Sequence, residues 1–138
     1  PDNVRTFTEA YEEKNRITLE LKSLDARAQK GRIPRRRYKV QRRTLEVRLD
    51  VLSKNITQLK ETLRSAGGVY SDLVRQLDAT ETELNEAETD SRSAEARYRR
   101  GELSLEEYKK FLADYQRGKE KAETAINGIL LRLREEIR

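Results

Sequence analysis

The stretch Gly31-Arg32-Ile33-Pro34-Arg35-Arg36-Arg37-Tyr38 decides the fold, because it returns seventy residues later as Gly101-Glu102-Leu103-Ser104-Leu105-Glu106-Glu107-Tyr108. In each copy a glycine can end one helix in the left-handed conformation. Three residues after the glycine stands Pro34 in the first copy and Ser104 in the second, and both residue types commonly start a helix. The repeated stretch therefore predicts two helical hairpins, with their tips at Gly31 and Gly101.

The similarity between the two copies extends along the whole chain. At the same offset Asn15 matches Asn85, and Arg27 matches Arg97. Seventy residues are ten heptads, so a coiled-coil seam would stay in phase between the copies. We expect an all-α fold in which the same helical hairpin occurs twice. Hairpin one, with a basic tip, covers 1–66, a Gly-Gly hinge lies at 67–68, and hairpin two covers 69–138.

Apolar residues in each predicted helix recur at alternating steps of three and four, which is typical of a coiled coil. The seam of the second predicted helix, which we expect to serve self-assembly, consists of Leu45, Leu49, Leu52, Ile56, Leu59 and Leu63. Val40, Val47 and Val51 widen this helix and predict a second packing surface. Two arrangements stay open: an elongated rod of two hairpins, or a four-helix bundle.

The amino-acid composition limits the kinds of function to be expected of this chain. Charged residues make up 40% of the 138 residues and aromatic residues 6%, so the chain has a thin seam in place of a broad core. Cysteine and histidine are absent, and the acidic side chains lie one helical turn from lysine or arginine, their ordinary structural role. We expect no enzymatic activity, no cofactor, no metal and no small-molecule substrate. The chain opens without methionine, and we expect it to be part of a longer protein.

Charge is divided unevenly between the two halves. Residues 1–68 hold seventeen basic and nine acidic side chains, whereas residues 69–138 hold thirteen and sixteen. The basic excess is concentrated at the first tip, where no acidic residue intervenes. The candidate polyanion-binding residues there are Lys30, Arg32, Arg35, Arg36, Arg37, Lys39, Arg42 and Arg43.

Three interpretations of this basic tip compete. It can be a solvated helix start, although basic residues are electrostatically unfavourable at a helix N-terminus. It can bind a polyanion, either DNA phosphate or an anionic membrane surface. It can also meet the acidic stretch 78–90 of another copy in a head-to-tail assembly. No aromatic residue is interleaved with the arginines to stack on bases, so readout of base sequence is not expected.

The two tips resemble a pattern in the CdvA family of archaeal cell-division proteins: a basic residue, a glycine, a charged residue, Ile or Leu, and a tyrosine seven residues after the glycine. The resemblance covers nearly the whole chain and concerns the central coiled coil of that family. It implies a scaffold that polymerises, associates with membrane and DNA, and acts upstream of ESCRT-III homologues. The β-rich N-terminal domain and the tail that engages the ESCRT-III partner lie outside this chain.

The sequence therefore predicts a non-enzymatic, self-assembling coiled-coil scaffold of archaeal cell division with a polyanion-binding tip. We expect it to be a cytoplasmic homo-oligomer at the inner face of the membrane, with ESCRT-III homologues bound through regions outside the chain. The alternatives are a nucleic-acid-binding helical module and a membrane-remodelling hairpin.

Overall fold

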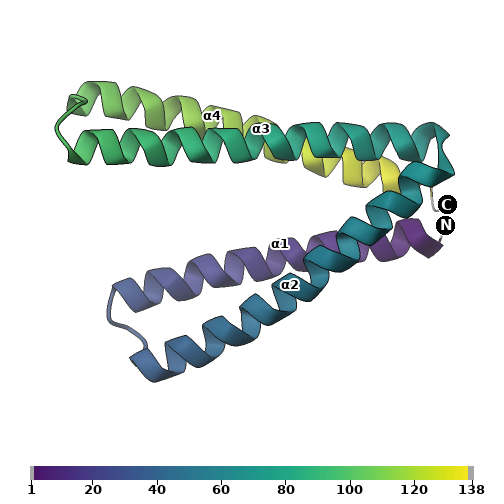
Figure 1. Cartoon of the computed structure of the whole chain (residues 1–138), viewed down its shortest axis with the longest axis horizontal. Helices are drawn as coiled ribbons and strands as arrows, with labels where there is room; N and C mark the ends of the chain where they lie inside the picture. Colours follow the sequence, from purple (N-terminus) through teal and green to yellow (C-terminus); the bar gives the residue numbers. More distant parts are fainter. Residues whose placement is uncertain (1, 137–138) are drawn as a thin grey trace. The chain divides into compact units, whose positions relative to one another are not determined.

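The computed structural model describes residues 2–136, which form four long helices joined by short turns. The helices are α1 (Asp2–Gln29), α2 (Arg35–Ala66), α3 (Gly68–Arg99) and α4 (Leu105–Glu135) (Figure 1). This confirms the all-α fold class predicted from the sequence. The described chain divides into two compact units, one comprising the residues up to Gly67 together with Glu136 and the other spanning Gly68–Glu135. Each unit is one helical hairpin.

In the first hairpin, α1 and α2 lie side by side and run in opposite directions (Figure 1). Two polar contacts between the helices define their register. Near the tip, the hydroxyl of Tyr38 donates a hydrogen bond to Asp25. Farther from the tip, Nη2 of Arg48 lies 2.9 Å from Oε1 of Glu13. In both pairs the two residues are nearly equidistant in sequence from Gly31. The position of the glycine therefore determines which residues of the two helices face each other.

Both hairpin tips are closed by the same set of backbone hydrogen bonds. The amide of Gly31 donates to the carbonyl oxygen of Ala28 at 3.1 Å, and the amide of Arg32 donates to that of Arg27 at 2.9 Å. Gly101 and Glu102 repeat these two bonds at 3.0 and 2.9 Å. This is the Schellman motif, which ends a helix by placing one residue at positive φ. Gly31 and Gly101 adopt φ values of 68° and 77°, as their predicted role as tips requires.

The returning helices start differently at the two tips. At the second tip, the amide of Glu107 donates to Ser104 Oγ at 3.1 Å, and the amide of Ser104 donates to Glu107 Oε1 at 3.0 Å. The sequence-predicted helix start at Ser104 is therefore a capping box. At the first tip, Pro34 precedes α2 and provides no side-chain hydrogen bond to its first turn.

Gly67 and Gly68 separate the two hairpins. Gly67 ends α2 with φ 70° and ψ −168°, a combination that is essentially restricted to glycine, and its amide donates to the carbonyl oxygen of Arg64 at 3.1 Å. Gly68 already belongs to α3, although its φ is also positive. The third helix thus begins one residue before the hairpin boundary predicted at residue 69.

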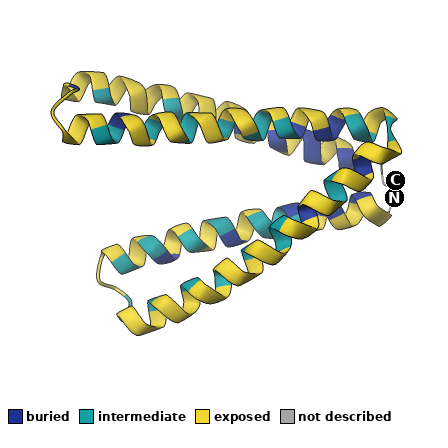
Figure 2. Ribbon diagram, viewed as in Figure 1, coloured by how far each residue is buried: buried dark blue, intermediate teal, exposed yellow. Residues whose placement is uncertain are grey.

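Burial follows a narrow row along each hairpin, and most of the surface near the tips is exposed (Figure 2). Within the predicted seam of α2, Ile56 and Leu63 are buried, whereas Leu45, Leu49, Leu52 and Leu59 are half-buried. The helix that packs beside this seam is α1 of the same hairpin. Self-assembly through the seam stays a prediction. The exposed side chains of α2 include Val40, Val47 and Val51, with 62%, 46% and 53% of their surface accessible.

Replacing Gly101 with alanine should destabilise the second hairpin by about 1 kcal/mol, because alanine resists positive φ. No neighbouring atom lies within 4 Å of a Cβ built at this position, so the loss would be conformational and not steric. Gly118→Ala is the matched control. Its Cβ would also meet nothing within 4 Å, but Gly118 lies inside α4, where alanine should stabilise by about 1 kcal/mol. Urea unfolding followed by circular dichroism measures both changes, and shifts of the same sign would contradict the left-handed cap.

Candidate functional site: a cationic hairpin tip

The first tip gathers all eight predicted polyanion-binding residues on the turn and the first turns of α2. The backbone reverses at Gly31, so the cations of the turn and those of α2 lie at the same end of the hairpin (Figure 1). Seven of the eight side chains are exposed, and only Arg42 is half-buried. The seven, named here the cationic tip, are Lys30, Arg32, Arg35, Arg36, Arg37, Lys39 and Arg43.

The cationic tip has no paired acidic side chain within the described chain. Over residues 2–136, none of the seven side chains forms an ion pair or a hydrogen bond with another side chain. They also adjoin the start of α2, where the helix dipole is positive and disfavours further positive charge. Positive charge at this end of the hairpin is therefore uncompensated within the described chain.

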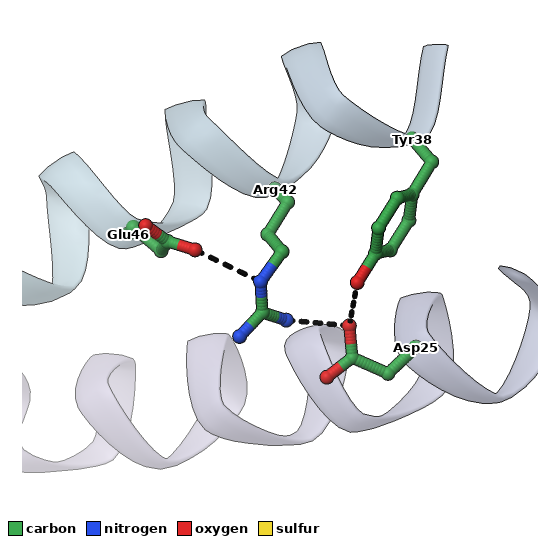
Figure 3. Close-up of polar contacts among 4 residues, drawn as sticks. All are labelled: Asp25, Tyr38, Arg42 and Glu46. Atoms are coloured by element: carbon green, nitrogen blue, oxygen red, sulfur yellow. Dashed lines mark hydrogen bonds and ion pairs between the residues drawn. The ribbon is translucent and has the colours of Figure 1, made fainter. Parts of the chain in front are cut away.

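Arg42 differs from the seven because it is held inside the hairpin. Its Nη1 lies 2.5 Å from Asp25 Oδ1, and its Nε lies 2.9 Å from Glu46 Oε1 (Figure 3). The hydroxyl of Tyr38 donates to the same oxygen of Asp25 at 2.6 Å. These four residues join α1 to α2 just below the tip. The structure thus places Arg42, predicted to bind a polyanion, in a network that fastens the two helices together.

This network was not predicted from the sequence, although the sequence contains a signal for it. Arg42 interrupts the apolar seam of α2, and a charged residue in a seam needs a partner on the facing helix. With the register set by Gly31, Asp25 of α1 lies close to the level of Tyr38 and Arg42. Combining the position of the tip with the charged seam residue would have identified Asp25.

The network shifts several pKa values, among them those of Asp25 and Tyr38. The hydrogen bond from Tyr38 lowers the pKa of Asp25 below its ordinary value of 3.8, and the hydrogen bond and positive charge of Arg42 lower it further. The same hydrogen bond raises the pKa of Tyr38, because ionisation would place a phenolate beside a carboxylate. Both shifts favour the state in which Asp25 is charged and Tyr38 is protonated.

The network should make the first hairpin sensitive to acid. The pKa of Asp25 is lower in the folded than in the unfolded chain, so its contribution is complete above the unfolded value and is lost as the pH falls through the folded value. We expect Asp25→Asn to be less stable than wild type at about pH 7, and we expect the difference to be smaller at about pH 2. Urea unfolding at both values measures the difference.

Asp50→Asn is the control for this experiment, because Asp50 is an exposed carboxylate of α2 whose ion pair with Lys54 lies within one helix. It should change stability little at either pH, as expected for an exposed pair of this kind. A loss in Asp25→Asn that persists unchanged in acid would contradict the assignment of the stabilisation to the charged carboxylate.

The second tip repeats the backbone of the first but not its chemistry. Leu112 occupies the position equivalent to Arg42, and Tyr98 the position equivalent to Ala28. The rings of Tyr98 and Tyr108 stack with centroids 4.6 Å apart and planes 5° from parallel. Next to the glycine, Arg100 pairs with Glu102 at 2.9 Å. Aromatic stacking and local pairing thus replace the polar network, and of the two tips in the described chain only the first has a cationic cluster with no acidic residue among its members.

Other kinds of site have little support among the described residues. In residues 2–136, no group of three acidic side chains gathers closely enough to hold a metal ion. Over the same range, no helix combines the length and the apolar composition that a membrane span requires. Among the described residues, the cationic tip is therefore the candidate site.

Comparison with protein-family models gives no match, and a search of curated proteins finds no sequence of significant similarity. The resemblance of the two tips to the CdvA family stays a prediction.

Proposed function

We propose that this chain is a non-enzymatic helical-hairpin scaffold whose cationic tip docks on a polyanionic surface. The observation that carries the proposal is the set of seven exposed cations at one hairpin end, none of which has a carboxylate partner over residues 2–136. Elsewhere in the same chain, arginines such as Arg48, Arg99 and Arg100 are paired with acidic side chains. An external anion would supply the missing charge.

Phosphate is the chemical group that best fits the cationic tip. Four of its members are arginines consecutive or nearly consecutive in sequence, and the guanidinium group can donate two parallel hydrogen bonds to phosphate oxygens. Duplex DNA and anionic lipid both present phosphate in dense arrays. The tip of a hairpin can approach either surface end-on, so the two sources are separated by experiment.

The resemblance of the tip motifs supports a more specific form of the proposal. A scaffold similar to the CdvA family would self-assemble in the cytoplasm at the inner face of the membrane in archaeal cell division. It would act upstream of ESCRT-III homologues, which would bind to regions outside this chain. A nucleic-acid-binding module and a membrane-remodelling hairpin are the alternatives, and both would use the same cationic tip.

The triple variant Arg35→Gln, Arg36→Gln, Arg37→Gln should weaken binding to anionic vesicles roughly a hundredfold, since each surface cation contributes about 1 kcal/mol. The probes are vesicles of phosphatidylglycerol, vesicles of phosphatidylcholine, and a random-sequence DNA duplex, each titrated at several salt concentrations. If DNA is the ligand, the logarithm of affinity should fall against the logarithm of salt with a slope of up to about −6 for seven phosphate contacts.

The matched control neutralises three cations of the second hairpin, Lys109, Lys110 and Lys121, which are exposed and belong to no ion pair in the described chain. It removes the same net charge but leaves the cationic tip intact, so binding should stay within a few-fold of wild type. Equal losses in both variants would mean that binding follows net charge and that the tip is not a site. Binding indifferent to salt and to lipid charge would refute the proposal.

A further inference from the structure

The two hairpins carry the same groove at the same place. A groove of about 460 Å³ lies between α1 and α2, and one of about 390 Å³ lies between α3 and α4. In the first hairpin the outgoing helix contributes Glu20, Ser23, Leu24 and Arg27. The residues seventy positions later contribute to the second groove in the same way. Three positions of the returning helix also coincide, so the two grooves lie at equivalent places in their hairpins.

Charge at the groove rim is preserved as well. Glu20 and Arg27 of the first groove correspond to Asp90 and Arg97 of the second. In each groove the acidic residue lies seven residues before the arginine, two helical turns and about 10 Å away along the axis. This separation is too large for the two to pair with each other. None of the four forms an ion pair with another side chain in the described part of the chain.

Between the two rim charges the lining of each groove mixes apolar and polar side chains. Leu24 and Ala94 lie at the two grooves with only 1% and 3% of their surface accessible. Ser23 and Ser93 lie beside them and are small enough to let another helix approach closely. Each groove also includes an exposed apolar side chain of the returning helix, Val40 in the first and Phe111 in the second.

We propose that each groove receives the groove of a second copy of this chain, with the two outgoing helices antiparallel. A two-fold axis passing between positions 23 and 24 would bring Arg27 of each copy opposite Glu20 of the other. Between positions 93 and 94 it would bring Arg97 opposite Asp90. The order of the acidic residue and the arginine along each outgoing helix is complementary to itself, as an isologous interface requires. The serines would then face each other, and the exposed apolar side chains Val40 and Phe111 would lie beside them.

This inference deepens the proposed scaffold function, on which it rests, by assigning the surface through which copies associate. The acidic residue precedes the arginine in both grooves, so either groove of one copy can also face either groove of another. Two such sites in one chain allow association to continue beyond a dimer. None of the seven residues of the cationic tip lines either groove.

The double variant Arg27→Glu, Arg97→Glu tests the interface, because it would place like charges opposite each other at every groove. In a light-scattering concentration series, wild type should exceed the monomer mass of 16.2 kDa. The variant should associate at least about tenfold more weakly. The control is Lys22→Glu, Lys121→Glu, which changes the net charge equally at exposed residues outside the grooves and should associate as wild type does.

A swapped variant, in which the two charges of each groove are exchanged, shows whether a loss of association in the first variant reflects misfolding. Glu20→Arg, Arg27→Glu, Asp90→Arg, Arg97→Glu exchanges the charges within each groove, so it should associate with itself as strongly as wild type but should not co-assemble with wild type. Three results would each overturn the inference. The first is a wild type that stays monomeric at all concentrations, and the second is an equal loss of association in the lysine control. The third is a swapped variant that does not self-associate although its circular dichroism matches that of wild type. Vesicle and DNA binding by the swapped variant should be unchanged, which separates this test from that of the cationic tip.

Discussion

Each hairpin depends on one backbone reversal at a glycine with positive φ. Gly31 and Gly101 allow the last carbonyl groups of α1 and α3 to be satisfied by amides of the turn, and the chain can then return antiparallel. Every pairing between helices follows from that reversal, because the glycine sets the register. Asp25 meets Tyr38, and Tyr98 stacks on Tyr108, only because the returning helix begins at a defined distance from the tip.

One backbone frame supports two chemically different tips. In the first, the half-buried network of Asp25, Tyr38 and Arg42 joins the helices, and the arginines beyond it have no partner in the described chain. In the second, Tyr98 and Tyr108 stack, a capping box satisfies the start of α4, and Arg100 pairs with Glu102. The first tip thus carries charge that its own hairpin does not neutralise, which is the physical basis for assigning it a ligand.

The two hairpins differ at their tips but share a groove between their helices. The cationic tip is found in one copy only, as expected for a site with its own ligand. The groove with an acidic residue before an arginine is found in both copies, as expected for a surface through which identical chains associate. Charges at the grooves and at the tip are exposed and would be screened by salt, so both kinds of contact would weaken as ionic strength rises.

The sequence by itself determined the helices, their ends and the position of the cationic tip. Local signals carry these features: glycine at positive φ, Ser104 with Glu107, and apolar steps of three and four act within one or two turns. Only the tertiary structure decided what those side chains meet. From the sequence alone, Arg42 was one of eight cations of the tip, and only the register shows that Asp25 lies beside it. Likewise, Glu20 and Arg27 are two charges of one helix in the sequence, and only the packing of α2 against α1 places them at a groove. The reason is physical: partners on facing helices are set by register and side-chain packing, which depend on residues far apart in the chain.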